Sequence, residues 1–496
     1  MRRPAVLSVA LLAAGSLVVP AAPAAAVDEV DTTRLTGAVT VDGIVGHLRV
    51  LQRIANENDG NRASGTPGYE ASARYVQERL LRAGYDVELQ EFTFPYYEEL
   101  TPTSLAQTSP EAADYETRPL TFSGNGQVEG TARVVDFADE LPSTSGCEAG
   151  DFAGFPAGAV AVLQRGTCSF AVKAANAEDA GAVAAVVVNA GVEDPEELLN
   201  GTLGAPGTGI PVVGLSAAAG AALVAAATAG DVELAVNVDT LLEDRTTWNV
   251  LADSPTGAAS RTVVVGAHLD STLEGPGIND NGTGVAAVLE IAEQMAELGV
   301  QNRQRVRFAF WGAEELGLLG SEHYVAQLSD RELRATYATL NFDMLGSPNW
   351  VPFVYDGDGS DTPLAGPPGS ARIERLFTDF LEPRGGSVPT DFDGRSDYGP
   401  FIAVGIPAGG LFSGAEGVKT EEEAERFGGT AGEAYDSCYH TPCDDTGNVS
   451  TAALAVLGDA AAHATMTMAR TKKGFFEDLS RNPAAGALEA PTGNAA

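Results

Sequence analysis

The chain has 496 residues, and its 68 acidic against 30 basic side chains give a formal net charge of -38. With 44% hydrophobic and 20% charged residues, the composition is that of a globular protein of two to three domains. The acid excess excludes nucleic acid and anionic lipid as the main partners, because both require a basic surface. It is compatible with cationic ligands and metal ions.

The N-terminus has the pattern of a targeting segment. Arg2 and Arg3 precede an apolar run over residues 5–19, and small residues follow up to position 26. A basic start, a short apolar stretch and a small-residue cleavage site predict a secretory signal peptide over residues 1–26. A membrane anchor is the alternative, but the run is shorter than the roughly 20 residues that a span needs. We therefore expect a secreted, extracellular protein that has no membrane contact after cleavage.

Export fixes the redox compartment of the four cysteines, which form an even set. Cys438 and Cys443 are close in sequence, and Cys147 and Cys168 share another region. The most economical disulfides are therefore Cys147–Cys168 and Cys438–Cys443, although four cysteines allow three arrangements.

The first region after the leader reads as two helices and a strand. Apolar residues recur at helical spacing from Ile44 to Ile54, a second helix is predicted over 69–83, and residues 87–94 alternate like a strand. Residues 95–130 are rich in Pro, Thr, Ser and acids, and we interpret them as a linker.

An Ala, Gly and Val-rich block follows and ends near Asp239. Its β-rich runs cover 132–137, 159–164 and 182–189, with one helix predicted over 171–180. The block contains no histidine, and its acids show no ligand-like clustering. We interpret it as a separate, non-catalytic domain.

From residue 247 to about 470, predicted strands and helices alternate, which indicates an α/β fold: a mixed, mainly parallel central sheet flanked by helices. Ligands bind at the carboxyl ends of the strands in such sheets. The predicted strands are 263–267, 306–310, 338–342 and 406–412, and the clearest helix is 283–298. Residues 471–496 are predicted to be a low-complexity tail.

Polar residues concentrate where these strands end. His268 and Asp270 are two positions apart, so they point to one side of an extended chain, and a metal-bound imidazole usually donates its other N–H to a carboxylate. Asp280 and Asn281 lie in a glycine-rich turn before a helix. Either could instead be an ordinary helix cap.

Three more acids follow later strands. Glu314 and Glu315 are adjacent, so one can bind a metal while the other faces substrate. In isolation a solvated acidic pair is the better interpretation, but apolar residues flank this pair at a strand end. Asp343 lies between two apolar residues at a strand end, where an unpaired charge is costly to bury and a nearby cation is a natural solution.

Tyr439 and His440 lie between Cys438 and Cys443. Two histidines and three carboxylates can hold two zinc ions when one carboxylate bridges them, and one further Glu remains as general base. His47, His323 and His463 have no such setting, and we interpret them as structural or surface residues.

Six segments closely resemble, in order and spacing, the secreted bacterial double-zinc aminopeptidases, a zinc peptidase family of leucyl aminopeptidase and aminopeptidase Y type. They are residues 266–271, 277–284, 311–317, 341–346, 393–401 and 438–444. The resemblance extends over 43–94 and 249–470, and the block between them resembles an inserted protease-associated (PA) domain. It implies a zinc-exopeptidase fold in which the PA domain is a small, β-rich α/β unit.

The implied organisation is a signal peptide (1–26), a split zinc aminopeptidase domain (27–100 and 241–470), a PA domain with its entry linker (101–240) and a tail (471–496). The implied activity is hydrolysis of the N-terminal peptide bond of peptides and proteins by an enzyme that we expect to be monomeric.

The resemblance also implies a role for each motif residue. Asp280 bridges two zinc ions, His268 and Asp343 complete one site, and Glu315 and His440 complete the other. Glu314 is implied as the general base, Asp270 as the support of His268, and Tyr439 as a hydrogen-bond donor to the developing oxyanion.

The resemblance places Met344, Arg395 and Phe412 in the substrate pocket, which predicts a preference for large apolar first residues such as Leu. It also implies a cis peptide bond after Asp280. A calcium site found in relatives is in doubt, because Asp459 is present but Ala455 replaces an expected acid.

Two alternative functions stay open. A zinc carboxypeptidase-like hydrolase needs a cation for the substrate carboxylate, and Arg395 could supply it. A non-catalytic, receptor-like protein on the same fold usually lacks some ligands, whereas here the full set is present.

Overall fold

The computed structural model describes residues 30–138, 141–192 and 194–472. The predicted signal peptide and all but two residues of the predicted tail lie outside this part of the chain. Among the described residues, the helices are all too short or too polar to serve as membrane spans.

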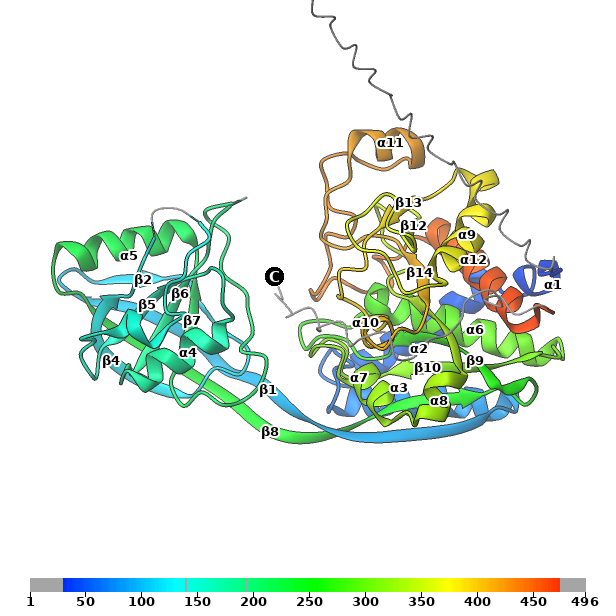
Figure 1. Ribbon diagram of the computed structural model, residues 1–496, viewed down its shortest axis with the longest axis horizontal. Coiled ribbons are helices and arrows are strands. Elements are labelled where there is room, and N and C mark those ends of the chain that lie inside the picture. The colour runs from blue at the N-terminus through cyan, green and yellow to red at the C-terminus, as the bar shows by residue number, and fades with distance from the viewer. Residues whose placement is uncertain (1–29, 139–140, 193, 473–496) are drawn as a thin grey trace, which may run out of the picture.

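Two bodies are joined by a long two-stranded ribbon (Figure 1). The ribbon consists of β1 (Asp86–Ser109) and β8 (Glu233–Asp253), which pair antiparallel along nearly their whole length. The prediction of a linker over residues 95–130 is therefore wrong, because β1 continues to Ser109. Its proline did not break the strand, since Pro95 lies where β1 has a neighbouring strand on one side only and the missing N–H costs no ladder bond there.

The larger body contains the predicted mixed, mainly parallel sheet, with strand order β13-β12-β14-β11-β9-β10-β8. Its four parallel central strands are β9 (Ala258–His268), β10 (Gln304–Trp311), β11 (Thr336–Phe342) and β14 (Ala408–Phe412). The edge on the other side of β14 is formed by β12 (Phe353–Tyr355) and β13 (Val388–Thr390). The predicted fold class is confirmed.

Helices cover both faces of this sheet, and the valines of β9 show why. Val263 and Val265 are buried in one apolar cluster, whereas Val264 is buried in the cluster on the opposite face. The first face carries α1 (Thr33–Thr36), α2 (Val41–Asn56), α3 (Pro67–Ala83), α6 (Gly284–Glu297), α9 (Ser370–Leu381) and α12 (Thr451–Arg470). The second face carries α7 (Leu319–Gln327), α8 (Asp330–Ala335) and α10 (Gly399–Ala403).

The predicted helix ends follow local chemistry. In α3 the Thr66 side chain accepts a hydrogen bond from the Tyr69 N–H, Pro67 occupies the first turn, and Gly84 ends the helix with a left-handed φ of 89°. A further short helix, α11 (Glu421–Phe427), begins with a capping box formed by Thr420 and Glu423.

In the smaller body the sheet continues beyond β8 through its antiparallel pairing with β4, and two apolar clusters form the core. Its strands are β4 (Gly126–Val134), β5 (Val160–Gln164), β6 (Ala184–Val188), β7 (Val212–Leu215) and the short β3 (Arg118–Pro119), while β2 (Ala113–Tyr115) pairs with the end of β1. Two helices flank the sheet: the predicted α4 (Phe170–Asp179), and α5 (Ala217–Ala229), which the analysis of the sequence missed. α5 is almost entirely Ala and therefore has no polar face to reveal its period.

Both expected disulfides are present. Cys147 pairs with Cys168 in the smaller body, and Cys438 pairs with Cys443 in the larger one. Among the described residues every cysteine is paired.

The base of the ribbon packs against the loops that follow β9 and β10. Phe92, Phe94 and Tyr96 of β1 form a buried cluster with Ala313, and Leu273 and the leucines around position 316 pack against it. The ribbon is therefore attached to the same loops that carry the polar strand-end residues.

Phe94→Ala should lower the free energy of unfolding of the larger body by about 3–5 kcal/mol, because it empties a nearly closed apolar site. Leu100→Ala, on an exposed part of the same strand, is the matched control and should change it by less than about 0.5 kcal/mol. Urea unfolding monitored by tryptophan fluorescence measures both, and equal effects would contradict the packing role of Phe94.

Candidate metal centre

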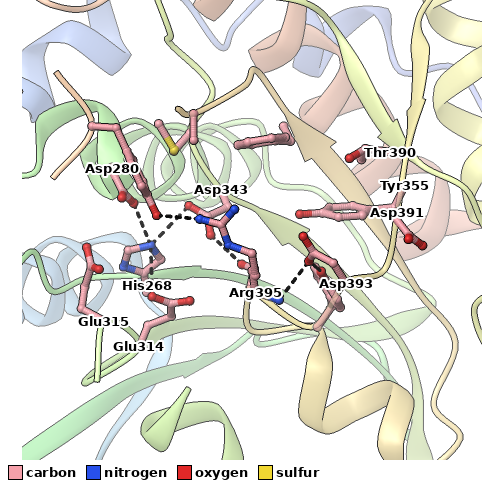
Figure 2. A pocket seen from close by; sticks show the side chains of 16 residues that line it. His268, Asp280, Glu314, Glu315, Asp343, Tyr355, Thr390, Asp391, Asp393 and Arg395 are labelled. Carbon is pink, nitrogen blue, oxygen red and sulfur yellow. Dashed lines mark hydrogen bonds and ion pairs between the residues drawn. The ribbon is translucent and has the colours of Figure 1, made fainter. Parts of the chain in front are cut away.

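The carboxyl ends of the parallel strands meet at one edge of the sheet, where they line a pocket (Figure 2). β9 ends at His268, and Glu314 and Glu315 follow β10. Asp343 follows β11, and Phe412 ends β14. The structure thus brings together residues separated by up to 172 positions, including His440 from the loop before α12.

Asp280 lies at the centre of this group with its two oxygens facing different partners. Its Oδ1 lies 3.2 Å from Nε2 of His268, and its Oδ2 lies 3.1 Å from Nε2 of His440. Each histidine also meets a second carboxylate: Asp343 Oδ1 is 3.2 Å from His268 Nε2, and Glu315 Oε2 is 3.0 Å from His440 Nε2. The result is two groups, each of one histidine nitrogen and two carboxylate oxygens, and the two groups share the Asp280 carboxylate.

These two groups fit a pair of tetrahedral metal ions. Metal–ligand bonds of 2.0–2.1 Å place neighbouring ligands about 3.3 Å apart, close to the separations found here. One oxygen of Glu315, Oε1, is buried without a hydrogen-bond partner among the described residues, as a metal ligand would be. Imidazole and carboxylate ligands together favour zinc.

The charges in the site also favour cations. Burial alone would lower the pKa of His268, but the carboxylates of Asp343 and Glu314 outweigh it and raise that pKa well above its usual value. Burial likewise opposes protonation of His440, yet Glu315 and Asp280 raise its pKa to about 11. The carboxylates therefore stabilise positive charge at the positions of the His268 and His440 rings.

Glu314 points to the same space at a greater distance. Its Oε2 lies 3.9 Å from His268 Nε2, and Figure 2 shows its carboxylate beside that ring. Burial raises the pKa of Glu314 well above its usual value. The two adjacent glutamates thus differ as the sequence indicated: Glu315 contacts His440, and Glu314 faces the pocket.

The sequence left open whether Asp280 and Asn281 belong to the site or cap the following helix, and the structure gives each residue one of these roles. Asn281 Oδ1 accepts hydrogen bonds from the Gly284 N–H at the start of α6 and from the Met344 N–H. This leaves the Asp280 carboxylate to face the histidines. The peptide bond between them is cis, as the resemblance implied, within the irregular turn η2 (Ile278–Thr283).

Strained turns present the ligands. Ala313, Met344 and His440 all have left-handed backbone conformations, with φ of 53–54°, which non-glycine residues rarely adopt. Each lies at or next to a predicted site residue. The Ala313 turn is held by a hydrogen bond from its N–H to Ser64 Oγ (2.7 Å), so strain here is stabilised by specific partners.

Asp270 lies behind His268, where the sequence placed it. His268 Nδ1 is 3.3 Å from the backbone carbonyl of Asp270 and 3.7 Å from its carboxylate. That carboxylate also accepts hydrogen bonds from the N–H groups of Glu314 and Glu315 (3.2 and 3.4 Å). Asp270 therefore connects two of the strand ends that supply the site.

Two residues that orient the candidate ligands were not predicted from the sequence. Ser396 donates a hydrogen bond to Asp343 Oδ2 (2.6 Å). Asp444 accepts hydrogen bonds from the N–H groups of Asn279 and Asp280 (2.7 and 3.0 Å) and so holds the turn that presents the shared carboxylate. Both lie inside segments that carry the resemblance, but only the fold shows what each one contacts.

Tyr439 and Arg395 also line the pocket. The Tyr439 ring stacks on the His440 ring, with centroids 3.8 Å apart, and its hydroxyl accepts a hydrogen bond from Arg395 (3.3 Å). Burial, together with Asp280 and other nearby acids, raises the pKa of Tyr439 far above its usual value, so its hydroxyl stays protonated. Arg395 is also paired with Glu416 (2.8 Å).

Met344 and Phe412 line the pocket, as predicted, and Tyr355 and Tyr398 add aromatic surface. The histidines interpreted as structural lie outside it; His47, for example, lies 3.3 Å from the buried carboxylate of Glu290. Asp459 belongs to none of the ligand-like groups found among the described residues.

A histidine and carboxylate cluster at the edge of a parallel α/β sheet is typical of metal-dependent hydrolases. A model of peptidase family M28 matches residues 249–465, and a model of the PA domain matches residues 130–223.

Two relatives match along most of their length. The chain is 48% identical over 454 residues to an aminopeptidase of Pseudomonas aeruginosa strain UCBPP-PA14, which covers 90% of this chain and 84% of the relative. It is 39% identical over 445 residues to leucine aminopeptidase 2 of Trichophyton tonsurans, covering 89% and 86%. The chain belongs to peptidase family M28 and carries a PA domain within its sequence.

Solved structures agree with this assignment. An aminopeptidase from Aneurinibacillus sp. strain AM-1 superposes with a TM-score of 0.73 at 27% identity, covering 89% of this chain and 97% of that one. The zinc aminopeptidase BSAP from Bacillus subtilis gives a TM-score of 0.63 at 25% identity, covering 87% and 95%. The predicted family and enzyme class are confirmed.

Ser396→Ala should weaken zinc binding by about 10–100-fold, because Asp343 loses the hydrogen bond that orients it. Ser72→Ala, at a buried serine of α3 that bonds only to Gly68, is the matched control and should leave metal affinity unchanged. Competition with a chromophoric chelator measures both affinities. Equal affinity in Ser396→Ala and the parent would show that Asp343 does not depend on this contact.

Proposed function

We propose that this M28 peptidase is a secreted, two-zinc aminopeptidase that hydrolyses the N-terminal peptide bond of peptides and proteins, with a preference for large apolar first residues such as Leu. The observation that carries the proposal is the carboxylate of Asp280, whose two oxygens each meet a different histidine with its own second carboxylate.

In this proposal His268 and Asp343 hold one zinc ion, Glu315 and His440 hold the other, and Asp280 binds both. When bound, the two ions supply the Lewis acidity that polarises the scissile carbonyl and makes water acidic at neutral pH.

Glu314 is the proposed general base. It takes a proton from the attacking water and returns it to the leaving amine, so one carboxylate serves both halves of the reaction. Its burial supports this role, because a carboxylate with a raised pKa holds the proton more firmly between the two steps. Tyr439 keeps its proton and lies in the pocket, which supports its role as hydrogen-bond donor to the developing oxyanion.

The acids around the pocket give a physical reason for exopeptidase action. A free α-ammonium group is attracted to them, whereas an internal peptide bond brings no such cation. Met344 and Phe412, with the tyrosines beside them, form an apolar surface for the first side chain. The leucine aminopeptidase among the relatives supports the same preference.

The carboxypeptidase alternative is disfavoured by the contacts of Arg395. Its guanidinium is paired with Glu416 and donates to Tyr439, so its charge is already balanced. The receptor-like alternative is disfavoured by the complete set of ligands. Secretion is supported by the N-terminal pattern and by the two disulfides; we propose a monomer.

Glu314→Gln should retain two zinc ions per chain but lose about 10²–10⁴-fold in kcat, because the amide cannot accept the proton of water. Metal content by mass spectrometry and turnover of leucine anilide measure the two effects. Glu297→Gln, at an exposed position on α6, should match the parent in both. Near-parental kcat in Glu314→Gln would remove this residue from its assigned role.

Leucine anilide should be hydrolysed with at least about tenfold higher kcat/KM than alanine anilide, because the pocket gains apolar contacts with the longer side chain. The N-acetylated leucine substrate should be inert, and chelation should abolish activity until zinc is restored. A clear preference for lysine or glutamate anilide would contradict the proposed specificity, and cleavage of the blocked substrate would contradict aminopeptidase action.

A further inference from the structure

Arg62 is a completely buried arginine beneath the metal centre, in the loop between α2 and α3. Its guanidinium donates to three backbone carbonyls: Pro276 (2.9 Å), Gly277 (2.6 Å) and Leu269. Its backbone contributes two more contacts, since its N–H donates to Ser271 Oγ (2.9 Å) and its carbonyl accepts from the Ser271 N–H (3.4 Å).

The segment that Arg62 holds is the connection between two proposed metal ligands. Residues 269–277 begin directly after His268 and end three positions before Asp280. Arg62 contacts both ends of this connection. The distance between His268 and the Asp280 carboxylate therefore depends on the conformation of this segment. The Arg62 side chain holds that conformation through its hydrogen bonds to the backbone.

This arrangement is specific to arginine. A guanidinium is a planar group with five N–H donors spread over three nitrogens, so it can bond to three separate carbonyls from one position. The donors of a lysine ammonium all lie on one nitrogen. Burial lowers the pKa of Arg62 to about 10, while Asp270, Asp444 and Asp280 oppose that effect, so the group remains charged at neutral pH. It places a permanent positive charge beside the acids of the centre.

Gly277 shows that the surrounding backbone accommodates the guanidinium. Its φ is 58°, and a Cβ there would lie 2.4 Å from Ser271 Cβ, 2.5 Å from the backbone oxygen of Asp280 and 3.2 Å from Nη2 of Arg62. A side chain at this position would therefore displace the contacts that Arg62 makes.

We propose that Arg62 is a positioning residue for the two-metal centre. It fixes the 269–277 connection, sets the separation of His268 and Asp280, and offsets the repulsion between the buried acids. The effect on zinc binding rests on the proposed function. The role of Arg62 in holding residues 269–277 applies to the metal-free protein as well.

The test uses Arg62→Gln and Arg62→Lys, compared with Arg79→Gln. Arg79 joins α3 to α6 through Glu293, so its loss removes a partly exposed ion pair outside the pocket. Circular dichroism and thermal unfolding first establish that each variant is folded. Zinc competition with a chelator and hydrogen exchange of residues 269–280 in the metal-free protein are the two readouts.

Both Arg62 variants should bind zinc about 10–100-fold more weakly and exchange the 269–280 amides faster, with kcat lowered more than KM is raised. Arg79→Gln should lose stability without either change. A folded Arg62→Gln protein with parental zinc affinity and parental exchange would overturn the proposal.

If the Arg62 variants do not fold, Ser271→Ala loosens the same connection, because it removes the oxygen that accepts the Arg62 N–H. It should reproduce the weaker zinc binding and faster exchange, and parental values for both would overturn the proposal. If instead the parent binds no zinc, the proposed function fails, while the hydrogen-exchange comparison still decides whether Arg62 holds the connection.

Discussion

The structure depends on one constraint: a single carboxylate, Asp280, must face two imidazoles while five other acids line the same pocket. Like charges at this density repel strongly in a buried site. Cations between the acids would reduce this repulsion, and so do the hydrogen-bond partners that hold the acids in place from behind. Most of the unusual features of the larger body contribute in one of these two ways.

The fold provides the convergence, and local irregularities provide the orientation. Parallel strands bring the chain repeatedly to one edge of the sheet, but a regular strand or helix cannot aim every side chain at a common point. The left-handed conformations at Ala313, Met344 and His440, and the irregular turn around Asp280, supply the missing directions. Each is fixed by a hydrogen bond or by a covalent bridge, as with the Cys438–Cys443 loop that carries His440.

The parts that the sequence could predict are those that local patterns encode. The alternation of strands and helices predicted the sheet, and polar residues at strand ends predicted the members of the site. The contacts that orient those members join distant positions, such as Ser396 with Asp343 or Arg62 with Gly277, and no local pattern reveals them. The ribbon was missed for a related reason: its polar outer half resembles a linker until it pairs with β8, and Ser109 at its end pairs with Glu233, 124 positions further along the chain.

That ribbon also bears on why a second body can be inserted here without disrupting the site. β1 and β8 leave the sheet as a continuous pair, so the insertion interrupts no strand of the larger body. Its base is fixed by Phe92, Phe94 and Tyr96 against the loops after β9 and β10, with the Arg245 guanidinium 3.4 Å above the Tyr96 ring. Because Leu273 and Ala313 belong to the loops that follow His268 and that carry Glu314 and Glu315, this apolar contact joins the ribbon to the candidate site directly. The inserted PA domain is therefore attached to the larger body beside the loops that carry Asp270 and the two glutamates.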